Sequence, residues 1–201
     1  LIEGGFDLSL HSLVNHAFDV FPKGMIGGAH TDVQIFILER LRGYLREQGY
    51  SANEVESVLS MNPTRLQPIP KQLAAVRAFM KLPEAQSLVA ANKRVANILR
   101  QSAAKGESYV NADESGLKEP AERELHAKLA IVSQTAIALF DKGDYSGYLA
   151  SFATLKGPVD QFFDDVMVMV EDPELRRNRL ALLSDLQVAM NKVADISKLA
   201  A

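Results

Sequence analysis

The chain has 201 residues, 47% hydrophobic and 23% charged, which predicts a folded, soluble, globular protein. It contains no cysteine, which excludes a disulfide framework and a thiolate metal site and fits a reducing, cytoplasmic compartment. No stretch approaches the roughly 18 apolar residues of a membrane span, and no signal peptide is visible, so we expect no membrane contact. The net charge of −3 argues against an evenly basic nucleic-acid binder, so any RNA contact must be a local patch.

Apolar residues recur every three or four positions along the chain, which predicts helices. The first of these covers residues 5–21 and ends at Pro22, and Ser51 with Glu54 forms a predicted capping box for a short helix. Residues 62–70 hold three prolines and are expected to be a structured loop, and residues 105–119 form a polar loop that we expect to be mobile. The remaining helices up to this point are expected over residues 31–49, 71–81, 83–104, 120–140 and 144–155.

The end of the chain predicts a long helical hairpin. Its first helix is marked by apolar residues spaced three and four apart, namely Val159, Phe162, Phe163, Val166, Met169 and Val170. Asp172 is expected to cap the second helix, with Pro173 in its first turn, and a stripe from Leu175 to Ile196 suggests about seven turns. With no strand-like alternation, the fold class is all-α, a bundle of roughly eight or nine helices.

No catalytic or metal site is predicted. The four histidines are His11, His16, His30 and His126; none has the i, i+4 spacing of a helical metal pair, and none is followed by aspartate as in HD phosphohydrolases. Asp164 and Asp165 are adjacent, so on a helix their side chains diverge by about 100°. We expect them to be surface charges or to pair with a basic residue such as Arg94. The chain also lacks a P-loop, GxSxG and GxGxxG, so we expect it to hold no cofactor.

The helix expected over residues 83–104 carries a candidate RNA-binding face. Lys93, Asn97 and Arg100 share one side at i, i+4 and i+7, with Arg94 along an edge, opposite the predicted buried arc of Leu88, Val95, Ile98 and Leu99. Arginine can stack on or fork to an unpaired base, asparagine can bond a base edge, and lysine adds phosphate contact. The alternative is an ordinary solvated helix face.

A second basic cluster follows Pro173. Arg176, Arg177 and Arg179 lie near the start of a predicted helix, where positive charge opposes the helix dipole. This position suggests a binding partner or a neighbouring carboxylate. Arg176 and Arg177 are therefore also candidate tRNA contacts, and the plainer explanation is a salt bridge to Asp172 or Glu174.

Three segments carry a resemblance to a known family. They read LPEAQSLVAANKRVANIL over residues 82–99, EPAEREL over 119–125 and FFDDVMVMVEDPELRRNRLALL over 162–183. They occur in the order and at the approximate spacing found at the C-terminal end of the beta subunit of bacterial two-subunit glycyl-tRNA synthetases. More distantly, the pattern is similar to the DALR-type anticodon-binding domain of arginyl-tRNA synthetases.

The resemblance implies that residues 31–201 form a helical anticodon-binding domain and that residues 1–30 are an upstream helical segment joining a preceding region. It implies a part of a glycine–tRNA ligase that uses ATP and magnesium in an assembly of two alpha and two beta chains. The chemistry would belong to the alpha chain, and this fragment would bind the anticodon arm of glycine tRNA without a catalytic site of its own. The residues by themselves leave open a helical scaffold or protein-interaction module without an RNA role.

Overall fold

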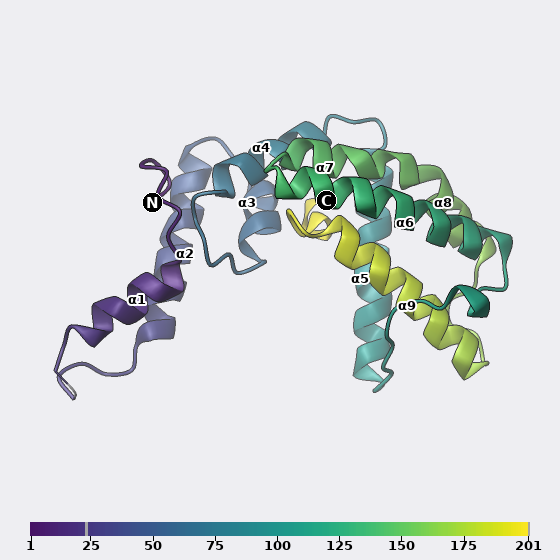
Figure 1. Ribbon diagram of the computed structural model, residues 1–201, viewed down its shortest axis with the longest axis horizontal. Helices are drawn as coiled ribbons and strands as arrows, with labels where there is room; N and C mark the ends of the chain where they lie inside the picture. The colour runs from purple at the N-terminus through teal and green to yellow at the C-terminus, as the bar shows by residue number, and fades with distance from the viewer. Residues whose placement is uncertain (23, 201) are drawn as a thin grey trace.

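A computed structural model of the chain describes residues 1–22 and 24–200, and within these ranges every regular element is helical (Figure 1). The α-helices are α1 (Leu10–Asp19), α2 (His30–Glu47), α3 (Ala52–Leu59), α4 (Ile69–Phe79), α5 (Ala85–Ala104), α6 (Pro120–Asp141), α7 (Tyr145–Ser151), α8 (Lys156–Asp165) and α9 (Pro173–Met190). Short 3-10 helices are η1 (Glu114–Gly116), η2 (Phe152–Leu155) and η3 (Ile196–Leu199). The predicted all-α fold is confirmed.

The body of the molecule is built from α3 to α9 around one hydrophobic core. α7 packs against α4 and α6, α8 runs beside α6, and α9 packs on α5 and α6 (Figure 1). The chain then folds back so that η3 lies against both α3 and α5. Fully buried Leu180, Leu182 and Leu183 on α9 and Phe162 on α8 anchor this core.

The N-terminal end is packed more sparsely. α1 packs against α2, and in Figure 1 this pair extends away from the body at one end of the molecule. α1 is shorter than the expected 5–21, and only Leu10 and Val14 on it are buried. α2 buries only Leu41 and Leu45, towards its C-terminal half. The domain boundary expected after residue 30 stays a prediction.

Several predicted helix ends are confirmed by their caps. Ser51 Oγ accepts from the amide of Glu54 at 3.2 Å while Glu54 Oε2 accepts from the amide of Ser51 at 2.7 Å, which completes the capping box. Asp172 Oδ1 accepts from the amides of Glu174 and Leu175 at the start of α9. These side chains satisfy amides that the first helical turn leaves without partners.

The expected length of the first hairpin helix is wrong. α8 ends at Asp165, and Val166 is already extended with φ −112° and ψ 117°. The following residues alternate, because Val166 and Val168 are buried whereas Met167 and Met169 are exposed. Arginine side chains from α9 also bind the carbonyl oxygens of Met167 and Val170. The segment is therefore an extended strap fixed to α9.

The second hairpin helix also ends early, at Met190 after 18 residues, or about five turns. Asn191 Oδ1 accepts from the amide of Ile196 at 3.1 Å, and the amide of Asp195 donates to Ser57 O at 2.7 Å. These bonds turn the chain towards α3. Val193 and Ile196 are buried as expected, but through this turn and η3 instead of a continuous helical stripe.

The polar loop after α5 is tied to α9. Asp185 Oδ2 accepts from the amide of Ala112 at 3.0 Å, and Asn178 both accepts from the amide of Asp113 at 2.7 Å and donates to its carbonyl oxygen at 2.9 Å. Leu117 is buried in the core. These contacts hold the second half of the loop in place, although the sequence had suggested a mobile segment.

Candidate nucleic-acid interface

The exposed face of α5 is basic, as the sequence predicts. Val95 and Leu99 are buried on the inner side, Ile98 is half-buried, and Lys93, Arg94, Asn97 and Arg100 are all exposed. None of the residues of α5 from Ala85 to Ala104 is aspartate or glutamate. The helix therefore presents three cations and no carboxylate of its own, in a chain whose net charge is −3.

Two contacts orient the polar side chains on this face. The guanidinium carbon of Arg94 lies 4.1 Å from the ring centroid of Phe163 on α8, a cation–π contact. Arg100 Nη2 donates a hydrogen bond of 2.9 Å to Asn97 Oδ1. The ion pair suggested between Arg94 and the aspartates of α8 does not form in the part of the chain that the structure describes. Arg94 stacks on the neighbouring aromatic ring instead.

The second basic cluster is divided by the fold. Arg179 is buried and pairs with Glu122, and Arg176 pairs with Glu107 at 2.9 Å. The salt bridges expected to Asp172 or Glu174 are therefore wrong for these two arginines, because Asp172 is occupied by backbone amides and the loop and α6 supply carboxylates from the side. Arg177 is exposed, and among the described residues it makes no hydrogen bond or ion pair.

The six candidate tRNA contacts thus differ in availability. Those on α5 share one exposed face. Arg177 is free to meet a ligand from the start of α9, whereas Arg176 is half-buried and already donates to Glu107 and to the carbonyl oxygens of Val170 and Glu171. Whether any of them touches RNA stays a prediction.

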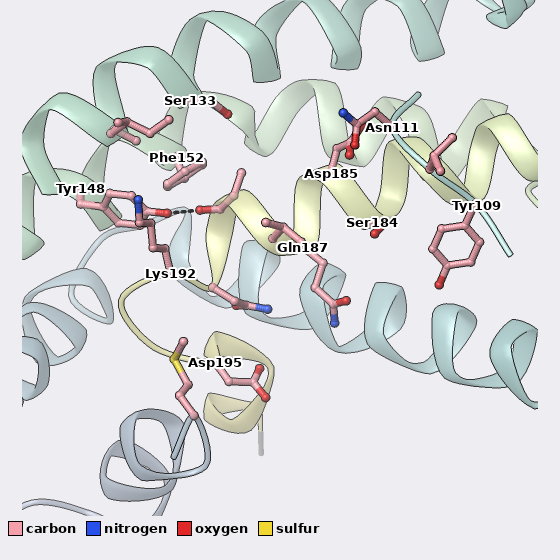
Figure 2. Close-up of a pocket in the computed structure, with 17 residues that line it drawn as sticks. Tyr109, Asn111, Ser133, Tyr148, Phe152, Ser184, Asp185, Gln187, Lys192 and Asp195 are labelled. Carbon is pink, nitrogen blue, oxygen red and sulfur yellow. Dashed lines mark hydrogen bonds between the residues drawn. The ribbon is translucent and has the colours of Figure 1, made fainter. Parts of the chain in front are cut away.

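Sequence reasoning missed a cleft of about 940 Å³ lined by α6, α9, the residues around Tyr148 and the loop at 109–111 (Figure 2). Its rim includes three strongly exposed apolar residues, Val110, Ile137 and Val188. These apolar residues lie outside the helix faces that the sequence predicted to be buried, and they were the signal that could have indicated the cleft. Tyr148 donates to Ala189 O, and burial raises the pKa of Tyr148 to about 12, so this hydroxyl is a structural donor and not an acid or base near neutral pH.

Two kinds of site were sought among the described residues. Over residues 1–22 and 24–200, no group of three or more histidine, aspartate or glutamate side chains is placed to hold a metal ion. No helix in the same ranges is long and apolar enough to cross a membrane. What the structure offers is an exposed basic face on α5 and a cleft with an apolar rim between α6 and α9.

The fold and the exposed basic face of α5 define a class, the all-α helical binding domains. A family model described as the DALR anticodon binding domain matches residues 88–199, from within α5 to the end of η3. Since this is more than half of the chain, the chain belongs to the DALR anticodon binding domain family.

The chain is also similar along its whole length to proteins named glycine–tRNA ligase beta subunit. It is 56% identical over 201 residues to that of Thiobacillus denitrificans, 58% identical over 204 residues to that of Dechloromonas aromatica and 50% identical over 201 residues to that of Leptothrix cholodnii. In each case the chain spans 28% of the length of the relative.

Proposed function

We propose that this chain is the tRNA-binding part of a glycine–tRNA ligase beta subunit and that the exposed face of α5 contacts the anticodon arm of glycine tRNA. The observation that carries the proposal is the basic face itself, with Lys93, Arg94 and Arg100 exposed and no carboxylate on the helix. Phosphate contacts supply affinity that does not depend on sequence, and asparagine and arginine can read bases. The family membership and the similarity to the beta subunits support the same function.

The wider activity follows as part of the same proposal. The chain would support the ATP- and magnesium-dependent attachment of glycine to its tRNA, in the cytoplasm, together with an alpha subunit and a second beta subunit. The fragment alone is expected neither to charge tRNA nor to hydrolyse nucleotides, because no catalytic constellation is predicted in it. A clean preparation that hydrolyses nucleotides would contradict this.

The alternative is a helical scaffold that binds only protein. The acidic net charge favours it, as does the apolar rim of the cleft between α6 and α9. Such a scaffold would not distinguish one RNA from another.

The experiment is a titration of the chain with glycine tRNA and with an anticodon-substituted copy, at several low salt concentrations. Lys93→Ala should weaken both complexes alike and reduce the slope of log affinity against log salt by about one, since one phosphate contact is lost. The matched control is Lys71→Ala, which removes an exposed lysine from α4 and should change neither. Equal binding of both tRNAs by the parent, unaffected by Lys93→Ala, would favour the scaffold.

A further inference from the structure

The hydrogen bond between Arg100 and Asn97 limits what the α5 face can recognise. A guanidinium has only donors, so the oxygen of the Asn97 amide has to face Arg100, as it does at 2.9 Å. Asn97 then turns its NH2 group towards a ligand, and Arg100 adds its remaining N–H groups. The pair therefore presents mostly hydrogen-bond donors, although an asparagine by itself offers a donor and an acceptor side by side.

A donor-rich pair selects among the four bases. Cytosine offers two adjacent acceptors, O2 and N3, on its Watson–Crick edge, and guanine offers O6 and N7 on its Hoogsteen edge. Donors and acceptors alternate along the edges of adenine and uracil. Either base would therefore place an N–H group against the donors of Asn97 and Arg100, or leave one of those donors without a partner. Leaving a polar group unpaired is what makes such recognition discriminating.

Arg94 lies at the edge of this face, three residues before Asn97. Side chains at i and i+3 are neighbours on a helix, about 5–6 Å apart at Cβ. The guanidinium carbon of Arg94 lies over the Phe163 ring, 4.1 Å from its centroid, and Arg94 is exposed to solvent. An unpaired base can stack on an arginine guanidinium, and a side chain already held by a neighbouring ring loses less entropy on binding.

We propose that Arg94, Asn97 and Arg100 form a reader for an unpaired base with two adjacent acceptors, cytosine or guanine, in which Arg94 on Phe163 is the stacking platform. The occupant is a single-stranded RNA loop, which fits the positive charge of a helix with no carboxylate between Ala85 and Ala104. This inference rests on the proposed function of the α5 face and adds the chemistry of the base that the face accepts.

The test uses four RNA stem-loops that differ only in one unpaired loop base, titrated with the protein by fluorescence anisotropy. The cytosine and guanine loops should bind about tenfold more tightly than the uracil and adenine loops, the discrimination expected of one good two-point contact. Arg100→Ala frees the Asn97 oxygen and should lower this preference while it improves relative binding of adenine, which asparagine alone recognises with one donor and one acceptor. Arg100→Lys should keep part of the preference because lysine still donates to that oxygen.

Two further variants separate reading from structure. Gln101→Ala changes an exposed amide next to the reader and should leave base preference unchanged. Phe163→Leu keeps an apolar side chain but removes the ring, and should weaken all four complexes about threefold to tenfold without changing their order.

The outcomes distinguish this inference from the proposed function. Equal binding of the four loops, or a preference that survives Arg100→Ala, overturns the reader, even where Lys93→Ala still weakens every RNA and upholds the RNA-binding function. Absence of binding to any RNA overturns both.

Discussion

The guanidinium of Arg179 on α9 and the carboxylate of Glu122 on α6 form an ion pair that is closed to solvent, with 4% and 0% of the two residues exposed. Arg179 Nη1 also donates to Met167 O at 2.7 Å, and the second oxygen of Glu122 accepts from the amides of Lys118 and Glu119 at 2.6 and 2.8 Å. One buried pair thus joins α9, the start of α6 and the extended strap after α8.

Removing one partner of this pair should be strongly destabilising. Arg179→Met should lower the free energy of unfolding by about 3–5 kcal/mol, because it leaves the Glu122 charge buried without a cation. Urea denaturation measures the effect. The double variant Arg179→Met with Glu122→Gln should lose less than the sum of the two single changes, since no buried charge remains. Additive losses would show that the two groups do not act as a pair.

The two adjacent phenylalanines of α8 should differ in their contribution to stability. Phe162 is fully buried, so Phe162→Ala should cost about 3–5 kcal/mol. The sequence placed Phe163 on the same apolar arc, but the structure leaves that ring half-buried beneath Arg94. Phe163→Ala should therefore cost less, about 1–2 kcal/mol, as packing and a partly exposed cation–π contact are lost. Equal denaturation midpoints for the two variants would contradict this orientation of α8.

The sequence predicted the helices well where local chemistry decides the structure. The capping box at Ser51 and Glu54, the Asp172 cap and the buried arc of α5 all follow from residue type and spacing. These features depend on residues within one or two helical turns of one another, so they can be predicted from the local sequence.

Features set by contacts distant in sequence were not predicted. The run Val166 to Val170 fits a helix by composition, yet Arg176 and Arg179 bind its carbonyl oxygens and hold it extended. Valine and methionine alternate in this run, which is typical of an extended segment. Because Val166, Met169 and Val170 also fit helical spacing, the sequence predicted a helix. The partners of the arginines on α9 were also missed, because Glu107 and Glu122 lie 69 and 57 residues away in the chain.

Stability in acid should depend on Glu54. Hydrogen bonds from Arg77, with help from the Ser51 amide, lower the pKa of Glu54 to about 2 from its usual 4.5. Because this pKa is lowered on folding, the stabilisation is complete above about pH 4.5 and is lost as the pH falls towards 2. The loss should be about 1–2 kcal/mol, since the Arg77 side chain is 42% exposed and water screens the pair.

Urea denaturation between about pH 6 and pH 2 compares the parent with Glu54→Gln, in which this part of the pH dependence should disappear. Glu56→Gln is the matched control, as Glu56 lies on the same helix in a more exposed ion pair with Arg42. Parallel pH profiles for the parent and Glu54→Gln would show that the Arg77 contact contributes nothing.

The adjacent arginines at the start of α9 should separate stability from RNA binding. Arg176 joins the loop after α5 to the strap through Glu107 and two carbonyl oxygens, so Arg176→Ala should lower the free energy of unfolding by about 1–3 kcal/mol. Arg177 is exposed, so Arg177→Ala should change stability by no more than about 0.5 kcal/mol.

In RNA titrations at a temperature where both variants are folded, the order should reverse. If the start of α9 contributes to the interface, Arg177→Ala should weaken every RNA alike and reduce the salt slope by about one, as expected for a phosphate contact. Arg176→Ala should bind nearly as the parent does, because its guanidinium is already bound within the protein. Unchanged binding by Arg177→Ala would confine the interface to α5, and weakened binding by Arg176→Ala in a fully folded sample would mean that the Glu107 pair opens when RNA binds.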